Sequence, residues 1–293
     1  MQKVSPISSN FKHYLPADLV TSGNEAVEIL LIGVGGNGGP MITGLARMDF
    51  ALRALGHGGL NLRVMDKDIV GPENVGRQLF SPSDISRNKA ECLVTRVNHF
   101  FGLRWKALPF DFEKHHVDEI SKKGVDIVIT AVDNVAAREL VHKAVKNEPI
   151  YHLDMGNTKN VGQCILGTGD YIKQPKNLGD CIGHLPTVID LYPNLRKEEA
   201  KSYQGPSCGI REAIERQDLL INTVVSTFAL TLLWDAFRNG FLTQHGVFIN
   251  LQTKRTSPLV INPAVWKGMG WDPAQCLTQR KSKPKKMPAR KAA

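Results

Sequence analysis

Short apolar runs alternate along the chain with longer segments in which apolar residues recur at helical spacing. The apolar runs predict strands, at 28–32 (EILLI), 62–65, 105–110, 125–131 (VDIVITA), 150–155 and 162–166. The helical spacing predicts helices, at 41–55, 85–101, 112–122 and 135–147. Because strands alternate with helices and several strands are apolar throughout, the pattern indicates an α/β, doubly wound Rossmann-like domain with a mostly parallel sheet.

The alternation stops near residue 168. Residues 169–207 are rich in Gly, Pro, Asp and Lys and have no sustained period, which predicts an insertion or lid. A helical pattern returns over 210–238, and strand-like segments follow at 246–252 and 259–262. The chain is therefore divided into an irregular lead-in (1–24), an α/β part (25–168), the insertion (169–207), the rest of the same domain (208–271) and a basic tail predicted to be disordered (272–293).

Glycines follow the first predicted strand directly. Gly33, Gly35 and Gly38 form a G-x-G-x-x-G pattern between a strand and a helix, with Gly36 inside it. Glycines let backbone N–H groups approach a phosphate, and a helix N-terminus favours its negative charge. The pattern is weak by itself, but its position between a strand and a helix predicts a nucleotide site.

An acidic residue at the end of the second strand is expected to bind the ribose of such a nucleotide. Asp66 holds that place, 28 residues after Gly38. The usual spacing is about 20 residues, so an extended first helix or loop is expected. Asp68 follows two residues later, and either acid has a plainer alternative as a turn former.

The polar residues that come next suit a triphosphate. Asn74, Arg77 and Gln78 lie in the segment NVGRQ, and Lys89 follows in SRNKA. A dinucleotide requires neither cation, whereas an arginine forks onto phosphate oxygens and a lysine supplies a point charge. Taken singly, each of these residues is more often a surface or capping residue, so the prediction depends on their order.

A further acid follows the strand predicted at 125–131. Asp133, with Asn134 after it, lies beside the crevice where open α/β sheets bind ligands. A carboxylate there suits a Mg²⁺ ion that bridges phosphates.

The chain is basic, but its charge is uneven. The formal net charge is +9, and seven basic residues with no acid lie between residues 277 and 293. Subtracting these seven charges leaves +2 for residues 1–276, so the folded part is nearly neutral. Nucleic acid is therefore expected as a partner only through the tail, and a solubilising tail is an equal alternative.

Cysteine usage and hydropathy point to a cytoplasmic protein. The five cysteines are scattered and form no C-x-x-C pair, which is not the pattern of a secreted disulfide framework or of a structural zinc site. The most apolar run, 219–234, is short and interrupted by Asn, Thr and Ser, so a buried helix is expected and no membrane association.

The ordered set of residues resembles the ThiF/MoeB/E1-like superfamily of adenylating enzymes. The resemblance is carried by GVGGNG (33–38), MDKD (65–68), NVGRQ (74–78), Lys89 and TAVDNVAAR (130–138). It covers roughly residues 28–166, with weaker agreement over 208–262. The segments 207–222 and 232–235 (LLWD) are most similar to the ThiF-related protein of a bacterial cassette that also carries a ParB-related protein (PRTRC).

The resemblance implies an ATP-dependent adenylyltransferase. Members of the superfamily activate the C-terminal glycine carboxylate of a small ubiquitin-like or sulfur-carrier protein and release pyrophosphate, and they are commonly homodimers. The implied catalytic groups are Arg77, Lys89 and Asp133, the last positioning Mg²⁺. The implied ATP-binding residues are Gly33, Gly35, Gly36, Gly38, Asp66, Asp68, Asn74, Arg77, Gln78, Lys89, Asp133 and Asn134.

Relatives can also carry a reactive cysteine near a crossover loop, which corresponds to the insertion 169–207. Cys208 is the first candidate because it precedes a predicted helix, whose N-terminus lowers a thiol pKa. Cys181, with His184 as a base, is the second candidate, and the alternative is that neither is catalytic. Many relatives bind a structural zinc through two C-x-x-C pairs, and none is expected here.

Two other functions stay open at this point. An NAD(P)-dependent oxidoreductase shares the glycine loop and the acid after the second strand, but it leaves Arg77 and Lys89 unexplained. The other is a non-catalytic scaffold that binds a nucleotide and a partner. The presence of Arg77, Lys89 and Asp133 argues against a chain that has lost the ability to react with ATP.

Overall fold

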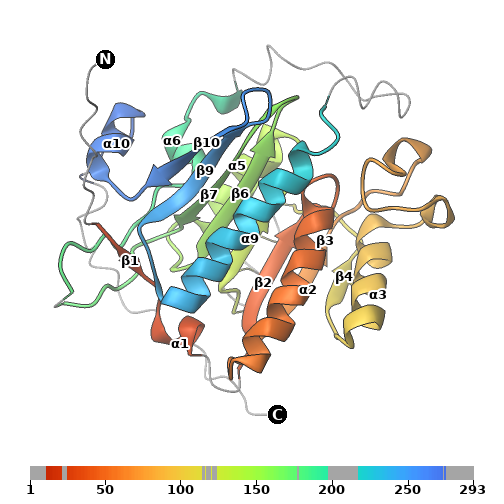
Figure 1. Ribbon diagram of the computed structural model, residues 1–293, viewed down its shortest axis with the longest axis horizontal. Coiled ribbons are helices and arrows are strands. Elements are labelled where there is room, and N and C mark those ends of the chain that lie inside the picture. Colours follow the sequence, from red (N-terminus) through yellow and green to blue (C-terminus); the bar gives the residue numbers. More distant parts are fainter. Residues whose placement is uncertain are drawn as a thin grey trace.

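The computed structural model describes residues 11–21, 25–113, 116, 120, 124–176, 178–196, 217–272 and 274. An eight-stranded sheet crosses the molecule in the order β10-β9-β7-β6-β5-β2-β3-β4 (Figure 1). Its strands are β2 (Val27–Ile32), β3 (Leu60–Met65), β4 (Lys106–Leu108), β5 (Ile127–Thr130), β6 (Tyr151–Asn157), β7 (Val161–Thr168), β9 (Gln244–Asn250) and β10 (Arg255–Val260).

Five of these strands form the parallel part of the sheet. β6, β5, β2, β3 and β4 are parallel to one another, whereas β7, β9 and β10 are added antiparallel beside β6. The two segments expected after the long helix form the antiparallel pair β9 and β10. The prediction of an α/β Rossmann-like fold with a mostly parallel sheet is confirmed.

Helices cover both faces of the sheet. α2 (Gly38–Ala54), α3 (Lys89–Phe101) and α9 (Ile221–Asn239) pack on one face, and α5 (Val135–Val145) packs on the other (Figure 1). The burial of the central strand β2 explains why its last four residues are all apolar. Ile29 and Leu31 lie in the core under α2 and α9, while Leu30 and Ile32 lie in the core under α5.

The remaining elements are short. β1 pairs antiparallel with β8 in a small second sheet. The elements are β1 (His13–Tyr14), α1 (Ala17–Val20), two 3₁₀ turns (Pro72–Asn74 and Pro82–Asp84), α6 (Val188–Leu191), β8 (Phe241–Leu242) and α10 (Pro263–Gly268).

The third helix begins later than the sequence predicts. α3 starts at Lys89, and its cap is Asn88, whose Oδ1 accepts the Glu91 N–H at 3.0 Å. Ser83 and Asp84, which precede the expected start at residue 85, belong to a 3₁₀ turn, in which the Asp84 carboxylate accepts the Ser81 N–H at 2.8 Å. The prediction of a helix from residue 85 was therefore wrong at its start.

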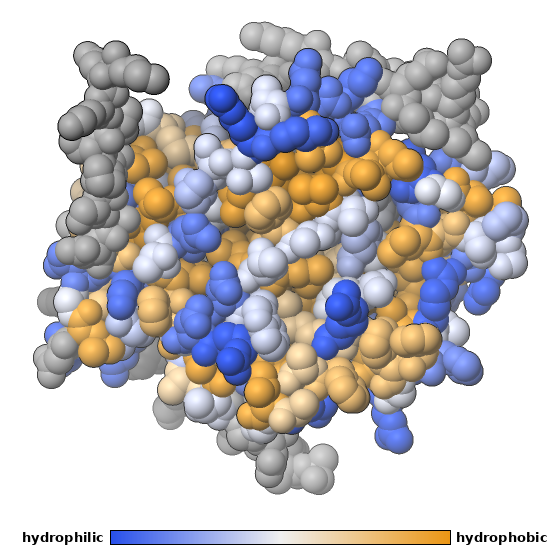
Figure 2. Space-filling view, in the orientation of Figure 1, coloured by the Kyte–Doolittle hydropathy of each residue, from blue (hydrophilic) through white to orange (hydrophobic). Residues whose placement is uncertain are grey.

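The long apolar helix α9 is a core helix. Its inner face buries Ile221, Val225, Ala229, Leu232 and Leu233, which are at most 3% exposed. Its outer face carries a line of exposed threonines at 223, 227 and 231. Apolar surface shows between polar side chains over α2 and α9 (Figure 2).

None of the described helices is long and apolar enough to cross a membrane. The expected helix over 210–238 begins only at Ile221 within the described residues, since Gln217–Leu220 are not helical.

The described part of the insertion packs against the sheet. Ile172, Ile182, Leu185, Val188 and Leu191 are at most 3% exposed and belong to the main core. Residues 197–207 lie outside the described residues, and so does the expected tail apart from Asp272 and Ala274. The crossover-loop role of 169–207 stays a prediction.

Three fully buried histidines make the fold sensitive to acid. Burial lowers the pKa of His13 and His245 to about 4 and that of His152 to about 3, from 6.5. The unfolded chain therefore binds more protons between pH 6.5 and 4, so their contribution to stability is complete above pH 6.5 and is lost as the pH falls. Burial also raises the pKa of the Asp66 and Asp154 carboxyls, so these two groups act in the opposite sense in the lower part of that window.

We expect the free energy of unfolding to fall by up to about 1.4 kcal/mol per pH unit for each such histidine. Urea unfolding at pH 7.5, 6.0 and 5.0 measures this dependence. A free energy of unfolding that stays constant from pH 7.5 to 5.0 would contradict it.

Candidate functional site

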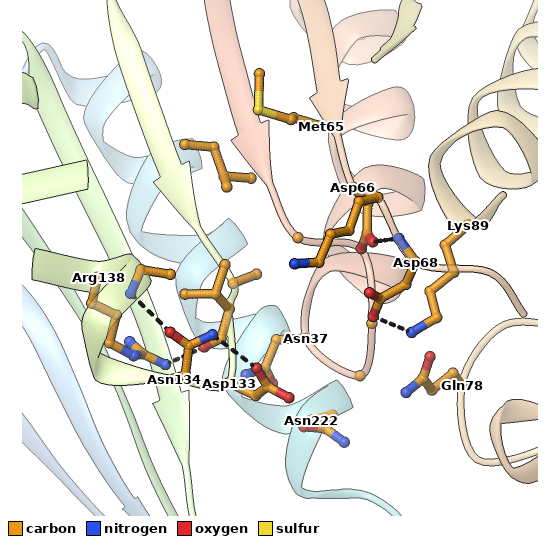
Figure 3. Close-up of a pocket in the computed structure, with 18 of the residues that line it drawn as sticks. Asn37, Met65, Asp66, Asp68, Gln78, Lys89, Asp133, Asn134, Arg138 and Asn222 are labelled. Atoms are coloured by element: carbon orange, nitrogen blue, oxygen red, sulfur yellow. Dashed lines mark hydrogen bonds and ion pairs between the residues drawn. The ribbon is translucent and has the colours of Figure 1, made fainter. Parts of the chain in front are cut away.

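A large pocket opens at the carboxyl ends of the parallel strands. Its volume is about 1360 Å³, and the loops after β2, β3 and β5 all contribute to its lining (Figure 3). In a parallel sheet the strand ends point the same way, so side chains that follow different strands meet there. Every residue predicted to bind ATP lies in this lining except Gly38, which begins α2 just behind it.

The glycine loop joins β2 to α2 by a sharp turn. Gly33 has φ +86°, and a Cβ there would lie 2.9 Å from the Ala131 carbonyl oxygen. At Gly38 a Cβ would collide with the Gly33 carbonyl oxygen, and at Gly36 it would lie 2.5 Å from the Asn222 amide nitrogen. Gly33 and Gly38 are therefore required by the backbone around the turn, whereas Gly36 lies against the Asn222 side chain of α9.

Gly35 differs from the other glycines of the loop. A Cβ there would meet only the Gln78 side chain, at 3.7 Å. It lies in the pocket lining, so its small size leaves room for a ligand to approach the backbone.

This difference predicts a contrast between two variants. We expect Gly33→Ala to lower the free energy of unfolding by about 1–3 kcal/mol, because alanine is strained at positive φ and its Cβ meets a backbone oxygen. Gly35→Ala is the matched control and is expected to fold normally. Urea unfolding of both variants measures the contrast, and equal stabilities would refute this account of the turn.

Asp66 fastens the glycine loop to the end of β3. Its Oδ2 accepts the Val34 N–H at 2.7 Å, and its Oδ1 accepts the Asp68 N–H at 2.8 Å. Burial raises the pKa of this carboxyl, while the two N–H donors act to lower it. Asp66, the residue expected to bind ribose, therefore also holds the backbone of the glycine loop in place.

Lys89 reaches the same turn from the first position of α3. Its Nζ lies 2.9 Å from Asp68 Oδ2, and its own N–H donates to the Asp68 carbonyl (Figure 3). The lysine side chain is 9% exposed, whereas Asp68 is 53% exposed. A buried ammonium is thus held at the pocket wall by a carboxylate that faces solvent.

Asn74 and Gln78 have different roles in the loop after β3. Asn74 is buried and its Oδ1 accepts the Gly71 N–H at 2.9 Å, so it shapes the 3₁₀ turn at Pro72–Asn74. Gln78 lies beside Gly35, and its buried Oε1 has no hydrogen-bond partner among the described residues.

Arg77 projects into the pocket from the same loop. Its Nη1 donates to Gln217 Oε1 at 3.0 Å, and its buried Nε has no partner among the described residues. Burial lowers its pKa, an effect opposed by Glu73 and Asp133. The guanidinium stays charged, since an arginine is not deprotonated in proteins.

Asp133 and Asn134 lie across the pocket from Lys89 (Figure 3). Asn134 caps α5, with its Oδ1 accepting the Ala137 N–H at 2.8 Å, while its amide lies 3.4 Å from Asp133 Oδ1. Asp133 is exposed to the pocket. Its carboxylate is therefore available to a ligand, whereas Asn134 acts chiefly as a cap.

Three comparisons relate this chain to known proteins. The model of the ThiF family matches residues 22–259, which is most of the chain. The protein belongs to the ThiF family. The match starts before the glycine loop and extends through β10, so in this ThiF-family chain it includes both the parallel strands and the added antiparallel ones.

Curated relatives match a shorter part of the chain. A ubiquitin-activating enzyme E1-like protein of Saccharomyces cerevisiae is 29% identical over 123 residues, covering 39% of this chain and 17% of that protein. The Nedd8-activating enzyme E1 catalytic subunit of Drosophila melanogaster is 29% identical over 116 residues, covering 39% and 24%. The chain thus spans less than a quarter of the length of these two relatives.

Solved structures align with a larger share of the chain than the curated relatives do. A structure of E. coli MccB with MccA-N7isoASN aligns with a TM-score of 0.57 at 15% identity, covering 83% of this chain and 67% of that one. PaaA aligns with a TM-score of 0.56 at 14% identity, covering 83% and 66%. At this level of identity the likeness concerns the fold.

Several site residues of this ThiF-family protein were not predicted from the sequence. Asn157 at the end of β6 and Lys159 in the turn after it reach the pocket. Gln217 reaches it from the segment before α9, and Asn222 from the first turn of that helix. Asn37 was quoted within the glycine motif, but nothing singled out its side chain, which donates to Asn157 Oδ1 at 2.9 Å. None of the motifs in the sequence assigns a role to these amide side chains, and only the folded chain brings them together.

Arg138 belongs to the framework of the site. It pairs with Asp154 on β6, and its Nη2 donates to the carbonyls of Val132 and Met155 at 2.7 and 2.8 Å. It therefore fixes the strand end from which Asp133 projects.

The candidate nucleophiles are not part of this pocket as described. Cys208 lies outside the described residues. Cys181 is half-buried and absent from the lining, and burial followed by the nearby Asp180 raises its pKa, the reverse of what an activated thiol needs. Cys92 and Cys164 are buried in the core.

The role of His184 as a base for Cys181 stays a prediction. The Nδ1 atom of His184 lies 3.1 Å from Thr168 Oγ1. Among the described residues, no group of three or more His, Cys, Asp or Glu side chains is placed to hold a metal ion.

Proposed function

We propose that this ThiF-family protein uses ATP to adenylate the C-terminal carboxylate of a small protein or peptide, releasing pyrophosphate. The observation that carries the proposal is the meeting of two cations at one glycine loop. Lys89 from α3 and Arg77 from the loop after β3 line the same pocket as Gly35 and Gly36. Two cations and a glycine loop suit the phosphates of a nucleoside triphosphate.

The donors and acceptors of the pocket fit such a nucleotide. Arg77 Nε, Gln78 Oε1 and Asn37 Oδ1 are buried polar atoms of lining residues without a hydrogen-bond partner among the described residues. Buried polar atoms of this kind require partners, and a nucleotide supplies both donors and acceptors. Asp66 at the end of β3 has the position for the ribose.

Asp133 is the residue for a Mg²⁺ ion bound with the nucleotide. The exposed carboxylate is a hard oxygen ligand, and Mg²⁺ is commonly held by one carboxylate together with phosphate oxygens. The ion would neutralise charge on the phosphates during the transfer. The role of the protein's own residues is to orient the nucleotide and to keep its α-phosphate accessible to the acceptor carboxylate.

The acceptor in this proposal is a small ubiquitin-like or sulfur-carrier protein that ends in glycine. The support is the family together with the relatives, which include ubiquitin- and Nedd8-activating enzymes. The resemblance of 207–222 to the PRTRC subgroup directs the choice of test proteins to small partners encoded at the same locus. A homodimer is also part of the proposal, on the pattern of the superfamily.

A thioester step is a finer part of the proposal. The thiolate of Cys208, or of Cys181 as the second candidate, attacks the adenylated carbonyl, a C–S bond forms, and AMP leaves with the electrons of the C–O bond. A Cys208→Ala variant that keeps adenylation but loses a thiol-labile adduct supports this step. Persistence of the adduct in the variant would exclude Cys208.

Exchange of labelled pyrophosphate into ATP tests the function. The full chain is mixed with Mg²⁺, ATP and each candidate partner, and we expect exchange only with a partner whose C-terminal glycine is intact. The same partner lacking its last glycine is the control. No exchange with any partner, together with oxidation or reduction of a nicotinamide, would refute adenylation and favour an oxidoreductase.

A further inference from the structure

The first turn of α9 and the segment just before it each contribute an amide side chain to the wall of the pocket, Asn222 and Gln217. Gln217 Oε1 accepts from Arg77 Nη1 at 3.0 Å and from Asn222 Nδ2 at 3.1 Å. One carbonyl oxygen has two lone pairs, so these two donors use its full acceptor capacity. Gln217 thereby joins the loop after β3 to the first turn of α9.

Asn222 extends this connection to the glycine loop. Asn222 is buried (Figure 3). A Cβ added at Gly36 would lie 2.5 Å from its amide nitrogen, so the glycine leaves the space that this side chain needs. One turn further along α9, Ser226 Oγ donates to the Asn37 carbonyl at 2.7 Å. The helix that follows the insertion therefore packs its polar first turns against the loop expected to hold phosphate.

The hydrogen-bond acceptor of Arg77 is a neutral amide, and this affects which donors of the guanidinium stay available. Its guanidinium has five N–H donors, of which Gln217 receives one at Nη1, while the buried Nε has no partner among the described residues. A carboxylate in place of the amide would accept two donors and form a stronger, charge-assisted pair. The neutral amide orients the cation and leaves its charge and most of its donors for an anion.

We propose that Gln217 is a positioning residue, which holds the Arg77 guanidinium toward the nucleotide phosphates while Asn222 anchors that amide to the glycine loop. The inference rests on the proposed function in one respect, namely that the ligand of the pocket is a nucleoside triphosphate. It adds a residue from the far side of the insertion to the phosphate site, 140 positions along the chain from Arg77.

Binding of Mg·ATP to the full chain, measured by calorimetry, tests the role of Gln217 without a carrier protein. Gln217→Ala leaves Arg77 unoriented and is expected to weaken binding about five- to tenfold, the effect of one hydrogen bond. Gln217→Glu pairs with Arg77 and adds negative charge, so it is expected to weaken binding at least about tenfold more. Gln244→Glu carries the same charge change at the start of β9, outside the pocket lining, and is expected to bind as the wild type does.

A double-mutant cycle separates positioning from a merely structural role. If Gln217 acts through Arg77, Gln217→Ala has no further effect on Mg·ATP affinity in an Arg77→Ala background. Additive losses would overturn the inference, and so would a Gln217→Glu variant that binds as tightly as the wild type. Thermal unfolding of each variant confirms that the compared proteins are folded.

The same measurements distinguish this inference from the proposed function. A wild-type protein that binds no Mg·ATP would refute both. A wild-type protein that binds Mg·ATP, with Gln217 variants that bind equally well, would refute the inference and leave adenylation standing.

Discussion

Lys89→Met is expected to lower partner-dependent pyrophosphate exchange about 100- to 1000-fold, the cost of removing one preorganised group that stabilises developing charge. The Lys89 side chain is 9% exposed and is held at 2.9 Å from Asp68. Methionine keeps the apolar stem packed, so the loss reports the missing ammonium. Asp68 remains solvated, which limits the damage to the fold.

Lys67→Met is the matched control for this prediction. Lys67 also lines the pocket, but its Nζ pairs with Asp111 at 2.6 Å on an exposed part of the turn. We expect this variant to keep exchange within about threefold of the wild type, because exposed ion pairs contribute little. Equal losses in the two variants would show that the pocket responds to net charge and that Lys89 has no specific role.

Asp154→Leu is expected to lower the free energy of unfolding by about 3–5 kcal/mol, because it leaves the Arg138 charge buried without its partner. Asp154 is 1% exposed and the Arg138 side chain 9%. Urea unfolding measures the loss. Since Arg138 also binds the carbonyls after β5 and on β6, we expect the carboxyl-end loop of Asp133 to loosen and exchange activity to fall as well.

Two further variants check this explanation. Asp111→Asn breaks an exposed ion pair and is expected to cost at most about 1 kcal/mol. The double change Arg138→Met with Asp154→Leu removes both buried charges and is expected to recover much of the lost stability. A double variant as unstable as Asp154→Leu would show that packing, and not the unpaired charge, determines the cost.

The strand-end residues were predictable because the sequence carries their positions directly. An apolar run buried on both faces marks a central strand, and the first polar residue after it marks the carboxyl end. This reasoning found Asp66 after β3 and Asp133 after β5, and the structure places both in one pocket. The glycine pattern was equally local, since Gly33 and Gly38 are required by the turn itself.

The start of α3 could not be predicted in the same way. Ser83, Asp84 and Asn88 are all good caps by residue type, so sequence alone offered several starts. Arg96 on α3 pairs with Asp84, whose carboxylate also accepts the Ser81 N–H, while Asn88 donates to the Asp66 carbonyl at 2.9 Å. These contacts, some of them distant along the chain, decide which cap is used and so place Lys89 at the first turn of the helix.

The sequence by itself determined the α/β architecture, the glycine loop and the order of charged residues, because each depends on local period, backbone freedom or position at a strand end. Only the tertiary structure decided what those residues touch. The Gln217 amide meets Arg77, Asn222 lies against Gly36, and Arg138 is paired inside the framework. Such contacts join segments far apart in the chain, and their physical basis is the packing of α9 and β6 against the loops, which no local pattern encodes.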